Sequence, residues 1–156
     1  MRLKNSVVLI TGASSGIGEA TALAFARKGA RLALCARRLE RIQAVAKKCR
    51  AAGSPKVTTK RVDVSKRTEA RGFVASALRD FDRVDILVNN AGLGWAGRLV
   101  EMPEDEARAL VDTHIRGVAR TARAPPEAMS AAGSGVVITV PPLSGVRPTP
   151  AAARHA

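Results

Sequence analysis

The sequence of 156 residues contains no tyrosine, and aromatic side chains make up only 3% of it. It is also poor in acidic residues, because 13 aspartates and glutamates stand against 26 lysines and arginines, which gives a formal charge of +13. Specific nucleic-acid binders combine such a charge with dense basic tracts or with aromatic residues on which bases stack. The basic residues here are scattered over every predicted helix. Specific nucleic-acid binding is therefore not expected, whereas weak, salt-sensitive association with polyanions is.

Long apolar runs are absent as well. No window approaches the roughly eighteen consecutive apolar residues of a membrane span, and the residues before Val7 do not resemble a signal peptide. We therefore expect a cytoplasmic protein without membrane attachment. The only two cysteines, Cys35 and Cys49, have neither metal-ligand nor redox-motif spacing, so they are predicted to be small core side chains, and no metal site is predicted.

What the sequence has is a regular alternation of short apolar runs and amphipathic helical patterns, with 46% hydrophobic residues overall. The apolar runs predict five strands, at residues 7–10, 31–35, 57–62, 86–89 and 136–140. Helices between successive strands imply right-handed crossovers and a parallel sheet covered on both faces, for which we expect the strand order 3-2-1-4-5. The predicted organisation is one domain over residues 1–140 and an irregular tail over 141–156, where Gly, Pro and Ala dominate.

The helical patterns also predict which faces are buried. For the helix over 17–28 the predicted inner face is Ile17, Ala20, Ala24 and Phe25. For the next helix it is Leu39, Ile42, Val45, Ala46 and Cys49. Ser65 is suited to cap a third helix, whose predicted inner face is Ala70, Phe73, Ala77 and Phe81. A long helix starting at Pro103 has the stripe Ala107, Leu110, Val111, His114 and Val118, so His114 is expected to point inward.

A glycine-rich stretch, Thr11 to Gly18, joins the first strand to the first helix. Such a turn gathers free backbone N–H groups and the positive end of the helix dipole at one point, which suits a phosphate. Gly12 would make the tight turn, Gly16 would allow close approach to a pyrophosphate, and Gly18 would let the helix pack closely on the strand. The alternative is a structural glycine-rich turn with no ligand. The context of strand, turn and helix favours a dinucleotide site.

The second strand ends in Ala36-Arg37-Arg38, close to twenty residues after the glycines, where a dinucleotide fold reads the adenosine ribose. An acidic residue there would accept hydrogen bonds from a free 2′-hydroxyl. Neutral Ala36 followed by two arginines instead favours a 2′-phosphate, and hence NADP(H) over NAD(H). The alternative is that Arg37 and Arg38 are merely solvated residues at a helix start.

Two further motifs follow the third and fourth strands. They are Asp63-Val64 and Asn89-Asn90-Ala91-Gly92. The amides of the second motif could hold a strand end against a cofactor, although a plain turn explains the same residues equally well.

Together, the glycine stretch, Asp63-Val64 and Asn89-Asn90-Ala91-Gly92 resemble the classical short-chain dehydrogenases/reductases, and the match extends over the whole chain. The resemblance implies an α/β Rossmann-type doubly wound sheet, incomplete on its C-terminal side, with residues 1–140 as an NADP(H)-binding domain. The Arg37-Arg38 pair is similar to that of the NADP(H)-preferring branch. The motif and the resemblance predict these cofactor-binding residues: Gly12, Ser14, Ser15, Gly16, Ile17, Gly18, Arg37, Arg38, Asp63, Val64, Asn90, Ala91 and Gly92.

Enzymes of this family interconvert a carbonyl and an alcohol by hydride transfer, using an Asn, a Ser and a Tyr-x-x-x-Lys motif. The resemblance puts His114 at the Asn position, Pro142 at the Ser position and His155 at the Tyr position, and the sequence ends before the Lys position. His114 and His155 are thus the catalytic candidates. We expect an oxidoreductase that is impaired or inactive in this form, a truncated pseudoenzyme.

The alternatives are a noncatalytic NADP(H)-binding or partner-binding module and a non-functional fragment from a decayed reading frame. Expected partners are a nicotinamide dinucleotide, a small carbonyl or alcohol substrate if the chain is active, and a second copy or an intact relative. If strands are missing beyond Val140, the run at 136–140 becomes an exposed edge strand that is prone to aggregation.

Overall fold

The structure is a computed structural model, and it describes residues 3–123, 125, 129–130 and 133–141. Its centre is one parallel sheet in the order β3-β2-β1-β4-β5, which confirms the predicted order. The strands are β1 (Val7–Thr11), β2 (Arg31–Ala36), β3 (Val57–Arg61), β4 (Ile86–Asn89) and β5 (Val136–Thr139). All four pairings are parallel, so the carboxyl ends of the strands lie along one edge of the sheet.

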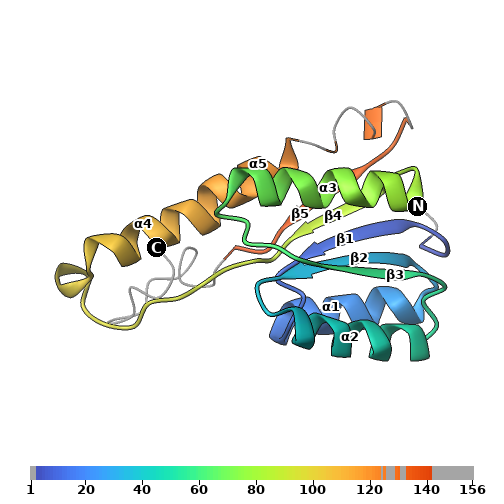
Figure 1. Cartoon of the computed structure of the whole chain (residues 1–156), viewed down its shortest axis with the longest axis horizontal. Coiled ribbons are helices and arrows are strands. Elements are labelled where there is room, and N and C mark those ends of the chain that lie inside the picture. Colours follow the sequence, from blue (N-terminus) through green and yellow to red (C-terminus); the bar gives the residue numbers. More distant parts are fainter. Residues whose placement is uncertain (1–2, 124, 126–128, 131–132, 142–156) are drawn as a thin grey trace.

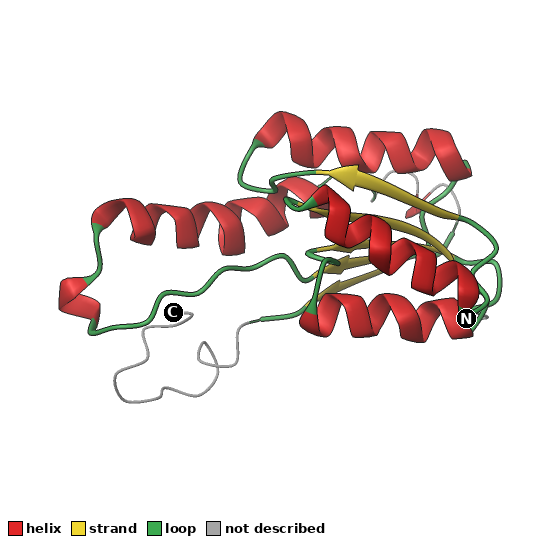
Figure 2. Cartoon of the chain, turned by 60° about the horizontal axis from the view of Figure 1, so that its bottom comes forward, coloured by secondary structure: helices red, strands yellow, loops and turns green. Residues whose placement is uncertain are grey.

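Helices cover both faces of this sheet (Figure 1). Helices α1 (Gly16–Arg27) and α2 (Leu39–Ala51) lie on one face, and α3 (Arg67–Phe81) lies on the other. The segment between β4 and β5 contains a 3-10 turn η1 (Leu99–Glu101), α4 (Glu104–Val111), the π-helical turn η2 (Asp112–Gly117) and α5 (Val118–Ala122). Figure 2 shows α4 leading away from the sheet, while α5 lies against the sheet beside α3 (Figure 1). No helix in the described ranges is long and apolar enough to cross a membrane.

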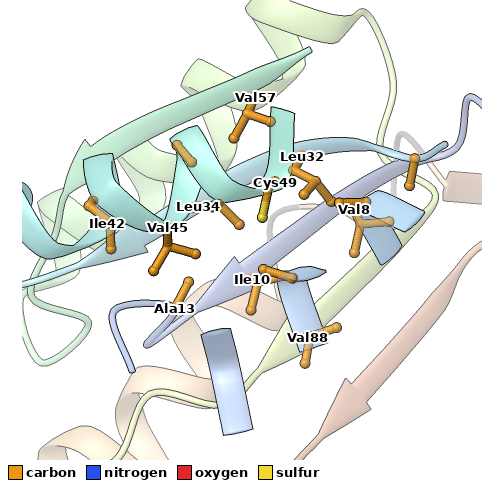
Figure 3. Close-up of a cluster of buried hydrophobic side chains, with 14 of the residues drawn as sticks. Val8, Ile10, Ala13, Leu32, Leu34, Ile42, Val45, Cys49, Val57 and Val88 are labelled. Carbon is orange, nitrogen blue, oxygen red and sulfur yellow. The ribbon is translucent and has the colours of Figure 1, made fainter. Parts of the chain in front are cut away.

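The core consists of two hydrophobic clusters, one on each face of the sheet. Alternate residues of β1 point to opposite faces, so Val8 and Ile10 belong to one cluster, and Val7 and Leu9 belong to the other. The first cluster packs Leu32 and Leu34 against α1 and α2 (Figure 3). The second packs Leu9, Leu87 and Val62 around Phe73 of α3. Strands buried on both faces explain why the sequence shows continuous apolar runs there rather than alternation.

The buried faces of α2 and α3 agree with the sequence pattern except at Leu39, which is exposed. Of the face predicted for α1, only Phe25 packs against the core, and the other three residues were wrong. The structure buries Gly18, Ala22 and Ala26, whereas Ile17 is 63% exposed and Ala20 and Ala24 also face solvent. Small side chains on the inner face let α1 pack closely against the sheet. Hydrophobic periodicity alone could not identify this inner face, because glycine and alanine contribute little to an apolar pattern.

Three other details differ from the sequence analysis. Ser65 does not cap α3, because its hydroxyl donates instead to Asp63 Oδ1 at 2.7 Å and the N-cap position is Lys66. Val111, predicted to be on the inner stripe, is exposed, and Leu110 is the buried residue of α4. In β5, Val136, Val137 and Ile138 are 41%, 44% and 39% exposed, so this strand is an apolar edge as predicted. The tail predicted from residue 141 lies outside the described residues beyond Pro141.

Candidate dinucleotide-binding site

A pocket of about 250 Å³ lies where the carboxyl ends of β1, β2 and β4 meet the start of α1. The same edge receives the loops that follow β3 and β4. The residues that line the pocket are Gly12, Ser14, Ser15, Cys35, Ala36, Arg37, Arg38, Val62, Asp63, Val64, Asn90, Ala91, Gly92, Leu93 and Thr113. Parallel α/β sheets bind ligands at this edge, because several loops and a helix N-terminus converge there.

The three glycines of the turn have different surroundings. Gly12 has φ +67° and no room for a side chain, since a Cβ there would lie 2.7 Å from Ala91 Cα. Gly18 has no room either, because a Cβ would lie 2.3 Å from the carbonyl oxygen of Gly12. Gly16 has φ +56° but faces open space, with nothing within 4 Å of an added Cβ. Gly12 and Gly18 are therefore needed for packing, whereas Gly16 keeps a turn of exposed backbone clear of side chains.

Hydrogen bonds from β4 hold the glycine turn in position. Asn90 Nδ2 donates to the carbonyl oxygens of Thr11 and Gly12 at 3.2 and 3.1 Å. Thr11 Oγ1 in turn accepts the backbone N–H groups of Asn90 and Ala91, both at 3.0 Å. Asn90 therefore does more than form a plain turn, because it joins the ends of two neighbouring strands at the floor of the pocket.

A neighbouring polar group, Asn89, is buried at the end of β4. Its Oδ1 accepts a hydrogen bond from Thr121 Oγ1 at 2.6 Å, and its Nδ2 has no hydrogen-bond partner among the described residues. Thr121 Oγ1 also lies 3.0 Å from the carbonyl oxygen of Gly117. The bond between Thr121 and Asn89 ties β4 to α5 behind the pocket.

Arg38 reaches over the glycine turn from the other side of the pocket. Its Nη2 donates to Ser14 Oγ at 3.3 Å and to Ser15 Oγ at 3.4 Å. Arg37 precedes it at the end of β2 and also lines the pocket. Two arginines and two serine hydroxyl groups thus line the same exposed rim, an arrangement suited to a phosphate.

Asp63 supplies the carboxylate on the pocket wall. Burial alone would raise its pKa, but the Ser65 hydroxyl and backbone N–H, together with the charges of Arg37 and Lys66, hold the pKa of Asp63 below its ordinary value. The backbone N–H of Asp63 donates to Glu69 Oε2 at 2.8 Å, which fixes the loop after β3. Asp63 is therefore an ionised, oriented hydrogen-bond acceptor.

The structure brings most of the predicted cofactor-binding residues into this one pocket. The three that do not line it are Gly16, Ile17 and Gly18, of which Gly18 is buried beneath the turn and the other two are exposed above it. Four lining residues went unnoticed in the sequence: Cys35, Val62, Leu93 and Thr113. Cys35 directly precedes Ala36 at the end of β2, and Val62 directly precedes the Asp63-Val64 motif after β3. Their positions next to these predicted site residues could have identified them from the sequence. Burial raises the pKa of the Cys35 thiol far above its ordinary value, so it is a neutral wall group.

His114 lies behind the pocket rather than in its lining. It belongs to η2, and its ring packs against Gly92, where an added Cβ would lie 2.7 Å from His114 Cε1. His114 Nε2 is 2.7 Å from the carbonyl oxygen of Leu93 and 3.3 Å from the Leu93 nitrogen. The shorter contact favours a proton on Nε2 that is donated to the carbonyl. His114 is half-buried and points inward as predicted. His155 and Pro142 lie outside the described residues.

The pocket fits a dinucleotide in its donor chemistry. It offers a glycine turn at a helix N-terminus, serine hydroxyls and two guanidinium groups for phosphates, and one ionised carboxylate for hydrogen-bond donors. Among the described residues, no group of three or more His, Cys, Asp or Glu side chains could hold a metal ion. Fold and site together define an α/β protein of the Rossmann, dinucleotide-binding class.

The chain belongs to the short chain dehydrogenase family, whose model matches residues 6–155. It is 37% identical over 153 residues to an uncharacterized oxidoreductase of Listeria innocua, covering 98% of this chain and 61% of that protein. The chain spans less than two thirds of the length of the first curated relatives it matches.

Solved structures agree with this assignment and differ in cofactor. A metagenomic short-chain oxidoreductase in complex with NADP is 36% identical with a TM-score of 0.90, over 98% of this chain and 69% of that one. An NAD⁺-bound xylitol dehydrogenase is 30% identical with a TM-score of 0.90, over 98% of this chain and 59% of that one. Family membership thus implies a nicotinamide dinucleotide, and the choice between NADP and NAD depends on the residues of this chain.

Proposed function

We propose that residues 1–140 bind NADP(H) in the pocket at the carboxyl edge of the sheet, as the nucleotide-binding part of an oxidoreductase that interconverts a carbonyl and an alcohol. The proposed contacts are those predicted from the sequence: the turn from Gly12 to Gly18, Arg37 and Arg38, Asp63 and Val64, and Asn90 to Gly92. When bound, the nicotinamide would supply or accept the hydride.

The position of Arg38 is the observation that carries the preference for NADP(H). Its guanidinium lies within 3.4 Å of the hydroxyls of Ser14 and Ser15, beside the glycine turn, and Arg37 adjoins it. The strand end that would supply an acid to a free 2′-hydroxyl has Ala36 instead. A 2′-phosphate near Ala36 would meet two guanidinium groups, whereas a 2′-hydroxyl would meet no carboxylate at that position.

A thermal melt with each cofactor tests this proposal. A ligand at 100 times its dissociation constant adds about 2.7 kcal/mol to the free energy of unfolding, which corresponds to several degrees for a domain of this size. We expect NADPH to raise the melting temperature and NADH to raise it much less. The variant R37Q/R38Q should lose the NADPH shift, whereas the charge-matched control R27Q/R41Q, altered on α1 and α2, should keep it. Equal shifts with both cofactors would refute the preference for NADP(H).

Catalysis by this chain is proposed to be weak. By the resemblance, Pro142 stands where a serine hydroxyl would polarise the substrate oxygen, and His155 stands where a tyrosine would transfer the proton. Positioned acid-base catalysis is worth about 10² to 10⁴ in rate. We expect NADPH oxidation with simple carbonyl substrates to be slower by about that factor than in a family member that has the Ser and Tyr residues. A rate matching that of such a family member would refute the impairment.

The two histidines are the remaining candidates for a role in that residual rate. If His155 transfers the proton, H155A should abolish the residual rate, and an unchanged rate would remove His155 from the chemistry. His114, hydrogen-bonded to the Leu93 carbonyl behind the pocket, is proposed to position the Gly92-Leu93 backbone. The variant H114N should therefore keep cofactor binding.

A noncatalytic, partner-binding role is the second candidate, and the exposed apolar strand β5 favours it. An edge strand of this kind can pair with another chain, either a second copy or an intact relative. Measuring carbonyl reduction with and without an added full-length relative distinguishes the two functions. If the chain only binds a partner, it should reduce no carbonyl alone, and it should change the rate of carbonyl reduction by the added relative.

A further inference from the structure

A second hollow in the surface is lined almost entirely by arginine. It has a volume of about 310 Å³ and lies between the start of α3 and the helical segment formed by η2 and α5. Its lining residues are Arg67, Arg71, Arg116, Ala119, Arg120 and Arg123. Figure 1 shows the first turns of α3 beside α5. This arginine groove shares no lining residue with the dinucleotide pocket.

The spacing of the arginines explains how they come together. Arg67 and Arg71 are four residues apart on α3, and Arg116, Arg120 and Arg123 follow each other by four and three residues along η2 and α5. Residues at these spacings lie on one side of a helix, so two rows of guanidinium groups line the same groove. Like charges at this spacing destabilise a helix, so helix stability does not explain why the arginines are placed there.

Carboxylates neutralise only part of this charge. Asp112 Oδ1 lies 2.9 Å from Arg116 Nη1 and 3.9 Å from Arg120 Nη2, and Arg120 also donates to the Ser65 carbonyl. No ion pair among the described residues joins the other three arginines of the groove to a carboxylate. The neighbouring helix α4 differs, since its Arg108 pairs with Glu104 at 2.5 Å.

The start of α3 adds to the positive potential. Its N-cap residue, Lys66, makes no side-chain hydrogen bond to the first turn, and the first helical residue is Arg67. The N-terminus of a helix carries a partial positive charge, which Glu69 in the first turn offsets in part, since its Oε1 lies 3.7 Å from Lys66 Nζ. An anion in the arginine groove would lower the remaining repulsion among the guanidinium groups.

From these observations we propose that the arginine groove binds a compact anion with adjacent phosphate groups. A guanidinium group can donate two parallel hydrogen bonds to the oxygens of one phosphate, and three arginines without a carboxylate partner match a ligand with several negative charges in a small volume. Adjacent phosphates supply that density. The groove has no aromatic side chain in its lining on which the bases of a nucleic acid could stack, so an extended single strand fits it less well. This site is independent of NADP(H) binding.

Calorimetric titration with tripolyphosphate, at about 150 mM salt, tests the proposal. The wild-type chain should bind the probe, and R67Q/R71Q should bind it about ten-fold or more weakly, because two charged hydrogen-bonding groups are lost. The control R27Q/R41Q removes the same charge from α1 and α2, on the opposite face of the sheet, and should change the affinity less than about two-fold. The single change R123Q should weaken binding by an intermediate factor. Thermal melts of all variants report whether they are folded.

Several results would overturn the proposal. Absence of binding by the wild-type chain would do so, and an equal loss in R67Q/R71Q and R27Q/R41Q would mean a general charge effect. Loss of binding in R37Q/R38Q would place the probe in the dinucleotide pocket instead. Citrate binding as tightly as tripolyphosphate would refute the choice of phosphate, and tighter binding of a single-stranded oligonucleotide would indicate a nucleic-acid surface. Retained tripolyphosphate binding in R37Q/R38Q would support the groove even if NADPH failed to bind.

Discussion

Two halves of the molecule differ in how far their residues are buried. In the closed half, formed by β1 to β4 with α1 to α3, every residue of β1 and β4 is buried, and so are five of the six in β2. In the open half, formed by α4, η2, α5 and β5, every residue of β5 is exposed and α4 buries only Leu110. All but one of the residues that line the dinucleotide pocket belong to the closed half or to the loops that leave its strands, and the exception is Thr113. The open half thus contributes one lining residue, and it supports the pocket from behind through the contacts of His114 with Leu93 and of Thr121 with Asn89.

The largest expected contrast between the halves is in core packing. Leu34 in β2 is fully buried, so L34A should lower the free energy of unfolding by about 2–5 kcal/mol. Ile138 in β5 is 39% exposed, so I138A should cost about 1 kcal/mol, because less surface is lost from the core. Denaturant unfolding monitored by circular dichroism measures both values. Equal costs would mean that β5 is as well packed as the centre of the sheet.

The strands of the closed half were the most predictable part of the fold. The apolar runs of β1, β2 and β4 are continuous because both faces of these strands are covered, whereas the edge strand β3 buries only Val57. The crossover rule then orders the strands. The inner face of α1 did not, because Gly18, Ala22 and Ala26 give no apolar signal. Val111 and β5 show the converse, since apolar residues are left exposed where nothing in the described chain covers them.

The next contrast is between two glycines of the turn, Gly18 and Gly16. Substitution of Gly18 should mainly lower the stability of the fold, and substitution of Gly16 should mainly weaken cofactor binding. G18A should lower the free energy of unfolding by about 1–3 kcal/mol, because a Cβ would collide with the Gly12 carbonyl. G16A has open space and should cost only the strain of its left-handed backbone, about 1 kcal/mol. It should nevertheless reduce the NADPH-dependent shift in melting temperature, since a methyl group would stand where the proposed phosphate approaches. An unchanged shift in G16A would argue against the pyrophosphate position.

The pocket was predictable wherever a motif marks it and not where only the fold brings residues near. The glycine turn, Arg37-Arg38, Asp63-Val64 and Asn90-Ala91-Gly92 are all local signals, and they converge because parallel strands end at one edge. Leu93 lies in the loop after β4, and Thr113 lies in η2. Both line the pocket only because the segment between β4 and β5 folds back against it, and no local sequence pattern predicts that fold. The bonds from Arg38 to Ser14 and Ser15 likewise join residues more than twenty positions apart.

A charged substitution on β5 tests whether the open half promotes self-association. Val137 is 44% exposed on the last strand of the described sheet, and an apolar edge is a site for pairing between chains. V137K should reduce concentration-dependent association, measured by sedimentation velocity, while changing the free energy of unfolding by less than about 1 kcal/mol. The matched control V100K alters a valine that is 82% exposed outside the sheet and should leave association unchanged. Equal effects of both changes would mean that added charge, rather than the edge, is responsible.

The smallest expected effect concerns Asp63, on the pocket wall of the closed half. Because its pKa is lowered in the folded chain, its ionised form stabilises the fold above the unfolded pKa of about 3.9, and that contribution is lost as the pH falls through the folded value. D63N removes the charge but keeps an oxygen that accepts the bonds from Ser65. The difference in free energy of unfolding between wild type and D63N should therefore be constant above about pH 5 and shrink below about pH 4. A difference that stays constant to lower pH would mean that the Asp63 charge contributes nothing to stability, and the acid loss of stability would then come from other carboxylates.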